Sequence, residues 1–235
     1  MRGLVRRTVQ WMMVGAVVLP PGARGQDARS TIAVLPFENS GSYGQDREAF
    51  DALAVGLPVI LGATLAAHPA VAVVERGRLD QTLDQQKLAA ARRVDAGSAT
   101  EIAKASGAQY AVSGSFTDFY GKVRINARVV DARTGQILKV VSNDDPKLQD
   151  RAQLAAIVQI VADRIVGAMG LAPYPPAVAA RRRAVPTEAL TEFSRGLMFE
   201  NRGDRAKAAE AYQRALTSAP DLDEARSALQ RLKGG

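Results

Sequence analysis

The sequence predicts a mixed α/β domain of the α+β type, in which helices cover a sheet that contains antiparallel strand pairs. Three observations support this prediction. A short β-branched run at residues 71–74 is followed at once by leucines at helical spacing, as in a strand-to-helix turn. Residues 46–67 repeat apolar side chains at steps of three and four. Residues 110–141 hold successive strand patterns separated by tight turns.

The first two elements are a strand and a long helix. Thr31–Phe37 is apolar on both faces, which is typical of a central strand, and Pro36 should end it. The helix is expected over Asp46–Ala67, where Pro58 predicts a kink or a boundary. Its apolar stripe consists of Phe50, Leu53, Leu57, Ile60, Leu61 and Leu65.

The strand-to-helix turn comes next. Val71–Val74 suits a short buried strand, and good helix formers follow from Gly77 on. Asp80 falls in the first turn of this helix, where the macrodipole favours a carboxylate. Glu75 and Arg76 occupy the joint. We expect them to form a partly buried pair that fixes the turn; the alternative is a contact surface between subunits.

The rest of the domain is a short helix, three strands and a long helix. Ser98 should begin the short helix, because Glu101 three residues on completes a capping box, and Gly107 should end it. Gly121-Lys122 is a tight turn between the first two strands. The remaining elements are expected at Tyr110–Tyr120, Val123–Val130, Ile137–Val141 and Leu148–Met169.

Three sequence blocks around the strand-to-helix turn resemble one family. They are I-A-V-L-P-F-E-N at residues 32–39, V-E-R-x-R-L-D-x-x-L-x-x-Q-K-L at 74–88 and G-A-Q-Y-A-V-S-G-S-F-T-D-F at 107–119. Together they resemble the CsgG family of envelope proteins, typified by the curli secretion component, over Ser30–Met169. The resemblance implies a CsgG-like sheet covered by helices, and structural roles for the motif residues Glu75, Arg76, Leu79, Lys87 and Leu88. It leaves the activity open, because the family includes secretion pores, flagellar accessories and activators of cell-wall synthases.

Residues 1–25 have the pattern of a secretory signal peptide. A basic start precedes the apolar run Trp11–Leu19, which is too short to span a bilayer. Ala23-Arg24-Gly25 is a small-x-small cleavage site that would leave Gln26 as the first mature residue. The alternative is a short membrane anchor. Cleavage predicts a periplasmic protein.

Charge and cysteine content exclude several classes of function. The whole chain carries a net charge of +7, but the first 25 residues hold four arginines and no acid, so the mature chain carries only +3. A nucleic-acid partner therefore loses its main support. The absence of cysteine excludes disulfides and thiolate metal sites, and it excludes a lipoprotein, unlike the curli pore and the synthase activators that the chain resembles.

A linker and a helical repeat follow the first domain, which is expected over residues 26–170. The linker at 171–186 is rich in proline and arginine, so we expect it to be semi-extended and unpacked. Residues 187–235 resemble a tetratricopeptide repeat with a capping helix, although Glu192 and Arg195 depart from the residues that the repeat prefers. The matching positions are Gly196, Phe199, Gly203, Ala208, Tyr212, Ala215 and Pro220. A lone repeat should pack on the first domain, on a second copy or on a partner.

The sequence offers little for catalysis. His68, the single histidine, precedes a proline at a helix end and is expected at the surface or in a cap. Asp144-Asp145 and Asp221/Asp223 lack the spacing of a calcium loop. We therefore expect no catalytic residue, no metal and no cofactor. Arg181–Arg183 is expected to be a solvated part of the linker rather than a patch for anionic lipid or glycan.

The sequence thus predicts a non-enzymatic envelope accessory protein that acts through protein–protein interaction. Its partners would be envelope proteins, with self-association left open, and any membrane contact would be peripheral or through a partner. The alternatives are a subunit of a curli-type secretion channel and, less favoured, an unrecognised hydrolase. If the repeat binds a peptide, its inward face should include Phe193, Leu197, Glu200 and Asn201. Alternatively, Phe193 and Leu197 pack the repeat onto the first domain.

Overall fold

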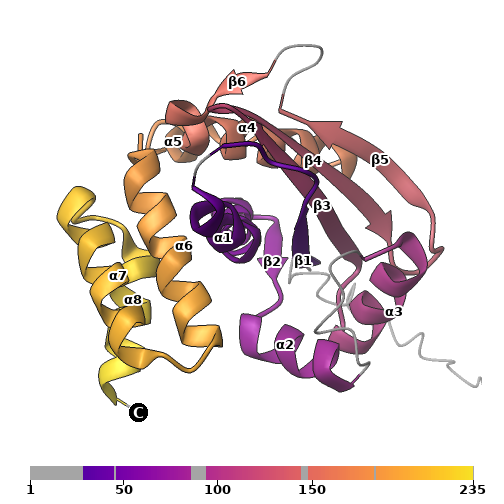
Figure 1. Cartoon of the computed structure of the whole chain (residues 1–235). Coiled ribbons are helices and arrows are strands. Elements are labelled where there is room, and N and C mark those ends of the chain that lie inside the picture. Colours follow the sequence, from indigo (N-terminus) through magenta and orange to yellow (C-terminus); the bar gives the residue numbers. More distant parts are fainter. Residues whose placement is uncertain (1–28, 45, 86–93, 144–147, 183, 235) are drawn as a thin grey trace, which may run out of the picture.

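The computed structural model describes residues 29–44, 46–85, 94–143, 148–182 and 184–234; the signal peptide expected at 1–25 lies outside these residues. Figure 1 shows a curved sheet with helices on it and further helices at the C-terminal end. The elements are β1 (Ser30–Asn39), α1 (Arg47–Ala66), β2 (Val71–Val73), α2 (Arg76–Gln85), α3 (Ala96–Ser106), β3 (Tyr110–Phe119), β4 (Lys122–Asp131), β5 (Ile137–Ser142), β6 (Gln149–Asp150), the 3-10 turn η1 (Arg151–Gln153), α4 (Leu154–Ala168), α5 (Pro176–Ala179), α6 (Thr187–Asn201), α7 (Arg205–Ser218) and α8 (Asp223–Gly234).

The sheet is mixed, which confirms the predicted fold class. Its strands lie in the order β2-β1-β3-β4-β5, and β6 pairs with the start of β4. β1 runs parallel to β2 and β3, whereas β4 runs antiparallel to β3 and β5. The predicted succession of strands and helices holds, with β6 as an additional short strand.

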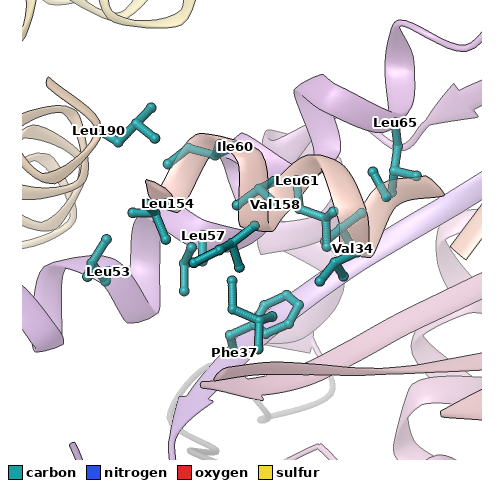
Figure 2. Packing of buried hydrophobic residues seen from close by; sticks show 14 of the residues in the cluster. Val34, Phe37, Leu53, Leu57, Ile60, Leu61, Leu65, Leu154, Val158 and Leu190 are labelled. Atoms are coloured by element: carbon teal, nitrogen blue, oxygen red, sulfur yellow. The ribbon is translucent and has the colours of Figure 1, made fainter. Parts of the chain in front are cut away.

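Helices bury both faces of this sheet. α1 and α4 cover one face, where Leu57 and Leu61 of α1 and Val158 of α4 meet Phe37 of β1 (Figure 2). α2 and α3 cover part of the other face with a smaller apolar cluster that includes Leu79. Each such side chain contributes about 1.5–3 kcal/mol by leaving water, so these contacts hold the layers together.

Neither Pro36 nor Pro58 ends the element that contains it, contrary to the prediction. β1 continues past Pro36 to Asn39, and the register of β1 against β3 shifts between Val34 and Phe37. An irregularity of this kind tolerates a residue that lacks a backbone N–H. α1 is likewise assigned as one helix through Pro58, so no boundary falls there.

Several element boundaries differ from the prediction. α3 begins at Ala96 because Asp95, rather than Ser98, is the N-cap; its carboxylate accepts the Ser98 N–H. Gly107 ends α3 with φ +75°, as predicted. The tight turn lies at Tyr120-Gly121, one residue earlier than expected, and both residues have positive φ. Residues 149–153, predicted as the start of the last helix, form β6 and η1.

α1 is the central helix of the molecule. It lies between the sheet and α6, and it also packs on α4 (Figure 1). By length and composition it is the one helix among the described residues that could cross a membrane, with mean hydropathy 1.8, but half of that window is buried inside the protein. Its apolar character is explained by the elements that surround it.

The linker at 171–186 packs on the body, contrary to the expectation of an extended segment. Tyr174 is 8% exposed and donates its hydroxyl to the Thr64 carbonyl of α1 at 3.0 Å. Arg182 covers the Tyr174 ring at 4.0 Å and forms two hydrogen bonds to the Asp163 carboxylate of α4. Burial raises the pKa of Tyr174 to about 12. Arg182 is therefore a structural residue rather than a solvated one.

Candidate functional site

The strand-to-helix turn is built differently from the expected Glu75–Arg76 pair. Glu75 is exposed, and Arg76 instead contacts Asp80 one helical turn on, with 3.4 Å between Nε and Oδ2. Arg76 also donates from Nη2 to Oδ1 of Asn201 at 2.6 Å, which ties the turn to the end of α6. Leu79 is buried, as a structural motif residue should be. Lys87 and Leu88 lie outside the described residues.

The C-terminal helices α6–α8, here called the helical unit, are docked on α1 through the face predicted to bind a partner. Phe193 and Leu197 are each 1% exposed and belong to the same core as α1 and α4. The two helices meet closely at Gly56 of α1, where an added Cβ would lie 1.8 Å from the Ser194 Oγ. The structure therefore supports the packing alternative for Phe193 and Leu197, which are not available to a partner.

The other two residues predicted for partner binding also have contacts within the chain. The Tyr212 hydroxyl donates to Oε2 of Glu200 at 2.5 Å, and burial together with this bond raises the pKa of Tyr212. Asn201 accepts from Arg76, as described above. All four predicted residues therefore contact other parts of this chain, either within the helical unit or between it and the rest of the domain.

An ion network explains why the helical unit departs from the repeat pattern at two positions. Arg195 pairs with Glu192 on its own helix and with Asp46 and Glu48 at the start of α1, at 3.0 and 3.3 Å. Glu192 also pairs with Arg214 of α7 at 2.7 Å. Burial alone would lower the pKa of Arg195, but the bond to Glu192 and the nearby carboxylates raise it instead. Arg195 is therefore a docking contact, and Glu192 links it to α7 within the helical unit.

Of the two places expected for His68, the surface and a cap, the structure supports the cap, because the residue is 3% exposed and lies at the end of α1. Its Nδ1 accepts the Ala70 N–H at 3.2 Å, so Nε2 carries the proton and donates to the Ala172 carbonyl at 3.0 Å. Its ring meets the Tyr174 ring edge-on, with 4.8 Å between centroids. Nε2 therefore holds the linker against the end of α1, and Nδ1 caps the turn that follows this helix, so both ring nitrogens have structural partners.

The described residues offer no assembled chemical centre. Among them, no group of three histidine or acidic side chains lies close enough to hold a metal ion. A cavity of about 110 Å³ lies between α1, α4 and the helical unit, lined by residues such as Ile60, Val158 and Phe193. Sites for small molecules usually measure about 300–1,000 Å³, so this cavity has room only for a fragment.

Exposed apolar side chains gather at two places on the sheet. The first, here called the aromatic tip, consists of Tyr43, Phe119 and Tyr120, which are 57%, 49% and 73% exposed. Their rings contact each other edge-on, with centroids 5.6 and 5.1 Å apart. The buried Asp118 carboxylate, next to Phe119, pairs with the partly exposed Arg151 at 2.8 Å and accepts the Gly121 N–H, which fixes the backbone beneath them. The tip is therefore preorganised.

The second place is the outer strand β5. Ile137, Leu138 and Val140 are 47%, 42% and 61% exposed. With Leu148 they complete the set of large exposed hydrophobic side chains among the described residues, and none of this set lies on the helical unit. The sequence patterns missed both places, because nothing in the sequence shows that the strand at 137–142 would end the sheet.

One protein family matches the N-terminal part of the chain. The family described as "Curli production assembly/transport component CsgG" matches residues 22–124. The matched segment is CsgG-like. It runs from before β1 into β4 and contains the strand-to-helix turn, so the resemblance predicted for Ser30–Met169 is confirmed as far as residue 124. No curated protein matches the chain.

Solved structures give remote similarities. The LpoB C-terminal domain from Salmonella enterica is 23% identical, with 51% of this chain and 84% of that chain covered and a TM-score of 0.37. LpoB from E. coli, solved by NMR, is 15% identical, with coverage of 64% and 82% and a TM-score of 0.38. The PelC dodecamer from Paraburkholderia phytofirmans is 14% identical, with coverage of 62% and 90% and a TM-score of 0.36.

Proposed function

We propose that this protein is a non-enzymatic accessory protein of the periplasm that binds another envelope protein through the aromatic tip and β5. The CsgG-family match supports the envelope assignment. The observation that carries the proposal is the placement of every large exposed hydrophobic side chain of the described residues on the sheet and its adjoining loops. Exposed apolar groups that gather in this way are typical of interaction surfaces.

The aromatic tip has the composition of an interface anchor. Tyrosine is enriched at the energetic centre of protein interfaces, and its ring buries much area at a small cost in side-chain entropy. Tyr120 has φ +50°, a backbone conformation that favours glycine or asparagine. An exposed aromatic residue in this conformation reduces stability locally, so a binding role accounts for it better than a folding role does.

In this proposal the helical unit is a single tetratricopeptide-like repeat that serves as a fixed part of the body. Its inward face binds α1 through Phe193 and Leu197, and Arg195 secures it to the start of α1. A repeat used in this way stabilises the body instead of recruiting a peptide.

Site-specific photocrosslinking in intact cells tests the proposed function. A benzoylphenylalanine at Tyr120 or Val140 should yield one discrete adduct with an envelope protein, identified by mass spectrometry. The same probe at Gln213, which is exposed on α7, is the matched control and should yield none. Equal adducts at all three positions, or none at Tyr120 and Val140, would contradict the proposal. Fractionation adds a second criterion, because a curli-type channel subunit would stay in the membrane fraction rather than in the aqueous periplasmic extract.

A further inference from the structure

β5 ends the sheet with an open edge. It pairs with β4 on one side, and no strand of the described residues pairs with its other side. Figure 1 shows it as the outermost strand, on the side of the sheet away from the helical unit. The outer side of such a strand presents backbone N–H and C=O groups that can pair with another chain.

Within the described ranges, this edge lacks most of the protection that soluble proteins usually give to outer strands. Natural edge strands are shielded by proline, by several charges, by bulges or by a covering loop. The segment I-L-K-V-V-S has no proline and one charged residue, Lys139. A register irregularity between Val129 and Val130 affects its first residues, but Ile137, Leu138 and Val140 remain open to solvent. The outer side of β5 is therefore available for backbone pairing with another chain.

The charges around β5 indicate what kind of chain would pair with it. Lys139 is exposed at the middle of the strand. Arg164 of α4 donates to the Ser142 carbonyl at the end of the strand, and Arg128 lies beside Val140 on β4. Arg128 interacts with the Asp95 carboxylate at the start of α3, and Asp131 already accepts the N–H groups of the following turn. Within the part of the chain that the structure describes, Lys139 and Arg164 therefore make the central and C-terminal parts of the edge cationic.

We propose that β5 accepts an extended segment of the partner protein as an added strand, and that this segment alternates apolar residues with acidic ones. This inference rests on the proposed function, for which it names the chemistry of the partner. Main-chain hydrogen bonds along β5 would supply affinity, as in other cases of strand addition. Apolar contacts with Val140 and Ile137 and an acidic side chain at Lys139 would supply selectivity.

A second copy of this chain suits the edge less well than an acidic strand. Antiparallel pairing of β5 with β5 centred on Lys139 would place the two Lys139 side chains opposite each other, and like charges opposed across strands are destabilising. An acidic segment would instead neutralise this charge. The charge pattern therefore favours a different protein as the occupant.

The direct test uses two end-blocked ten-residue probe peptides, one alternating valine with glutamate and one alternating valine with lysine. Added to isotope-labelled mature protein, the glutamate peptide should shift the amide resonances of residues 137–142 and slow their hydrogen exchange. Lys139→Glu should weaken the glutamate peptide and strengthen the lysine peptide by about tenfold each, the scale of a single close charge pair. Val140→Lys should also weaken binding, whereas Gln213→Lys, the same substitution on α7, should not.

Four outcomes would overturn the inference. These are equal affinity for both peptides, shifts centred on the aromatic tip or the helical unit, no binding at about 5 mM peptide, and a concentration-dependent dimer in ultracentrifugation that Val140→Lys abolishes. The last result would make a second copy the occupant. The crosslinking described above keeps the two proposals distinguishable. If adducts persist while peptide binding fails, the partner exists but does not add a strand; if peptides bind without adducts, the proposed function fails instead.

Discussion

Replacing Gly56 by alanine should loosen the contact between α1 and α6. The new Cβ would lie 1.8 Å from the Ser194 Oγ, 2.5 Å from its Cβ and 3.0 Å from its Cα. Rotation of the serine side chain cannot relieve the last two contacts, so the helices must move apart locally until the carbons reach about 3.5–4.0 Å. Overpacking of this kind costs about 1–3 kcal/mol. Alanine recovers up to about 1 kcal/mol of helix propensity, so a cost in the middle of this range, about 2 kcal/mol, leaves a net loss of about 1–2 kcal/mol.

Urea unfolding followed by circular dichroism measures this loss. The matched control is Gly167→Ala in α4, where an added Cβ meets nothing within 4 Å, and which should be neutral or stabilising by up to about 1 kcal/mol. The double variant Gly56→Ala/Ser194→Gly should be more stable than the sum of the single changes by at least about 1 kcal/mol, because two of the three crowded atoms are removed. If Gly56→Ala stabilised the protein as Gly167→Ala does, the docked position of the helical unit would be refuted.

Three further predictions concern charge, the aromatic tip and pH. Glu192→Gln should lower the free energy of unfolding by about 1–3 kcal/mol, because it weakens a nearly buried bond to Arg195; Glu210→Gln, on the exposed side of α7, should have little effect in the same urea assay. Tyr120→Asn should stabilise the protein by about 1 kcal/mol, since asparagine suits positive φ, while reducing the yield of the adduct from a probe at Val140; an unchanged yield would remove Tyr120 from the interface. The Ser98 N–H lowers the pKa of Asp95 in the folded state, so the stability from this cap is present above the unfolded-state pKa and is lost as pH falls through the folded one. Asp95→Ala should therefore destabilise at pH 7 but differ little from wild type below about pH 3, and a difference independent of pH would contradict this assignment.

Local sequence patterns predicted the body of the fold well. The β-branched run at Val71 and the leucines after it define one strand-to-helix turn, and the alternation from Val123 to Val129 places β4 correctly. Errors arose where two local signals compete. Asp95 and Ser98 are both good N-caps, and the helical pattern before Leu154 gives way to pairing of Gln149 and Asp150 with the start of β4.

Contacts between distant parts of the chain could not be predicted from local sequence patterns. His68 precedes a proline at a helix end, and only the folded structure shows that residues 171–174 return to it. Phe193 and Leu197 fit a peptide-binding face and a packing face equally well by pattern. The sequence did contain a signal that favours the packing face. Glu192 and Arg195 depart from the residues expected for a repeat, and both lie on the helix that docks on α1.

The labelling rate of engineered cysteines tests the central claim most directly. The chain has no cysteine, so single substitutions report without background. Ser194→Cys lies between α1 and α6, where the native side chain is fully buried, whereas Val140→Cys lies on the open edge of β5. The structure predicts that a maleimide labels Cys at position 140 of the native protein as fast as it labels the urea-unfolded protein. At position 194 it should react only after the helical unit separates from α1. For an opening free energy near 3 kcal/mol, labelling at position 194 should be at least about 100-fold slower than at position 140. Equal rates at both positions in the native protein would show that the face of α6 is open and would contradict the docked position of the helical unit.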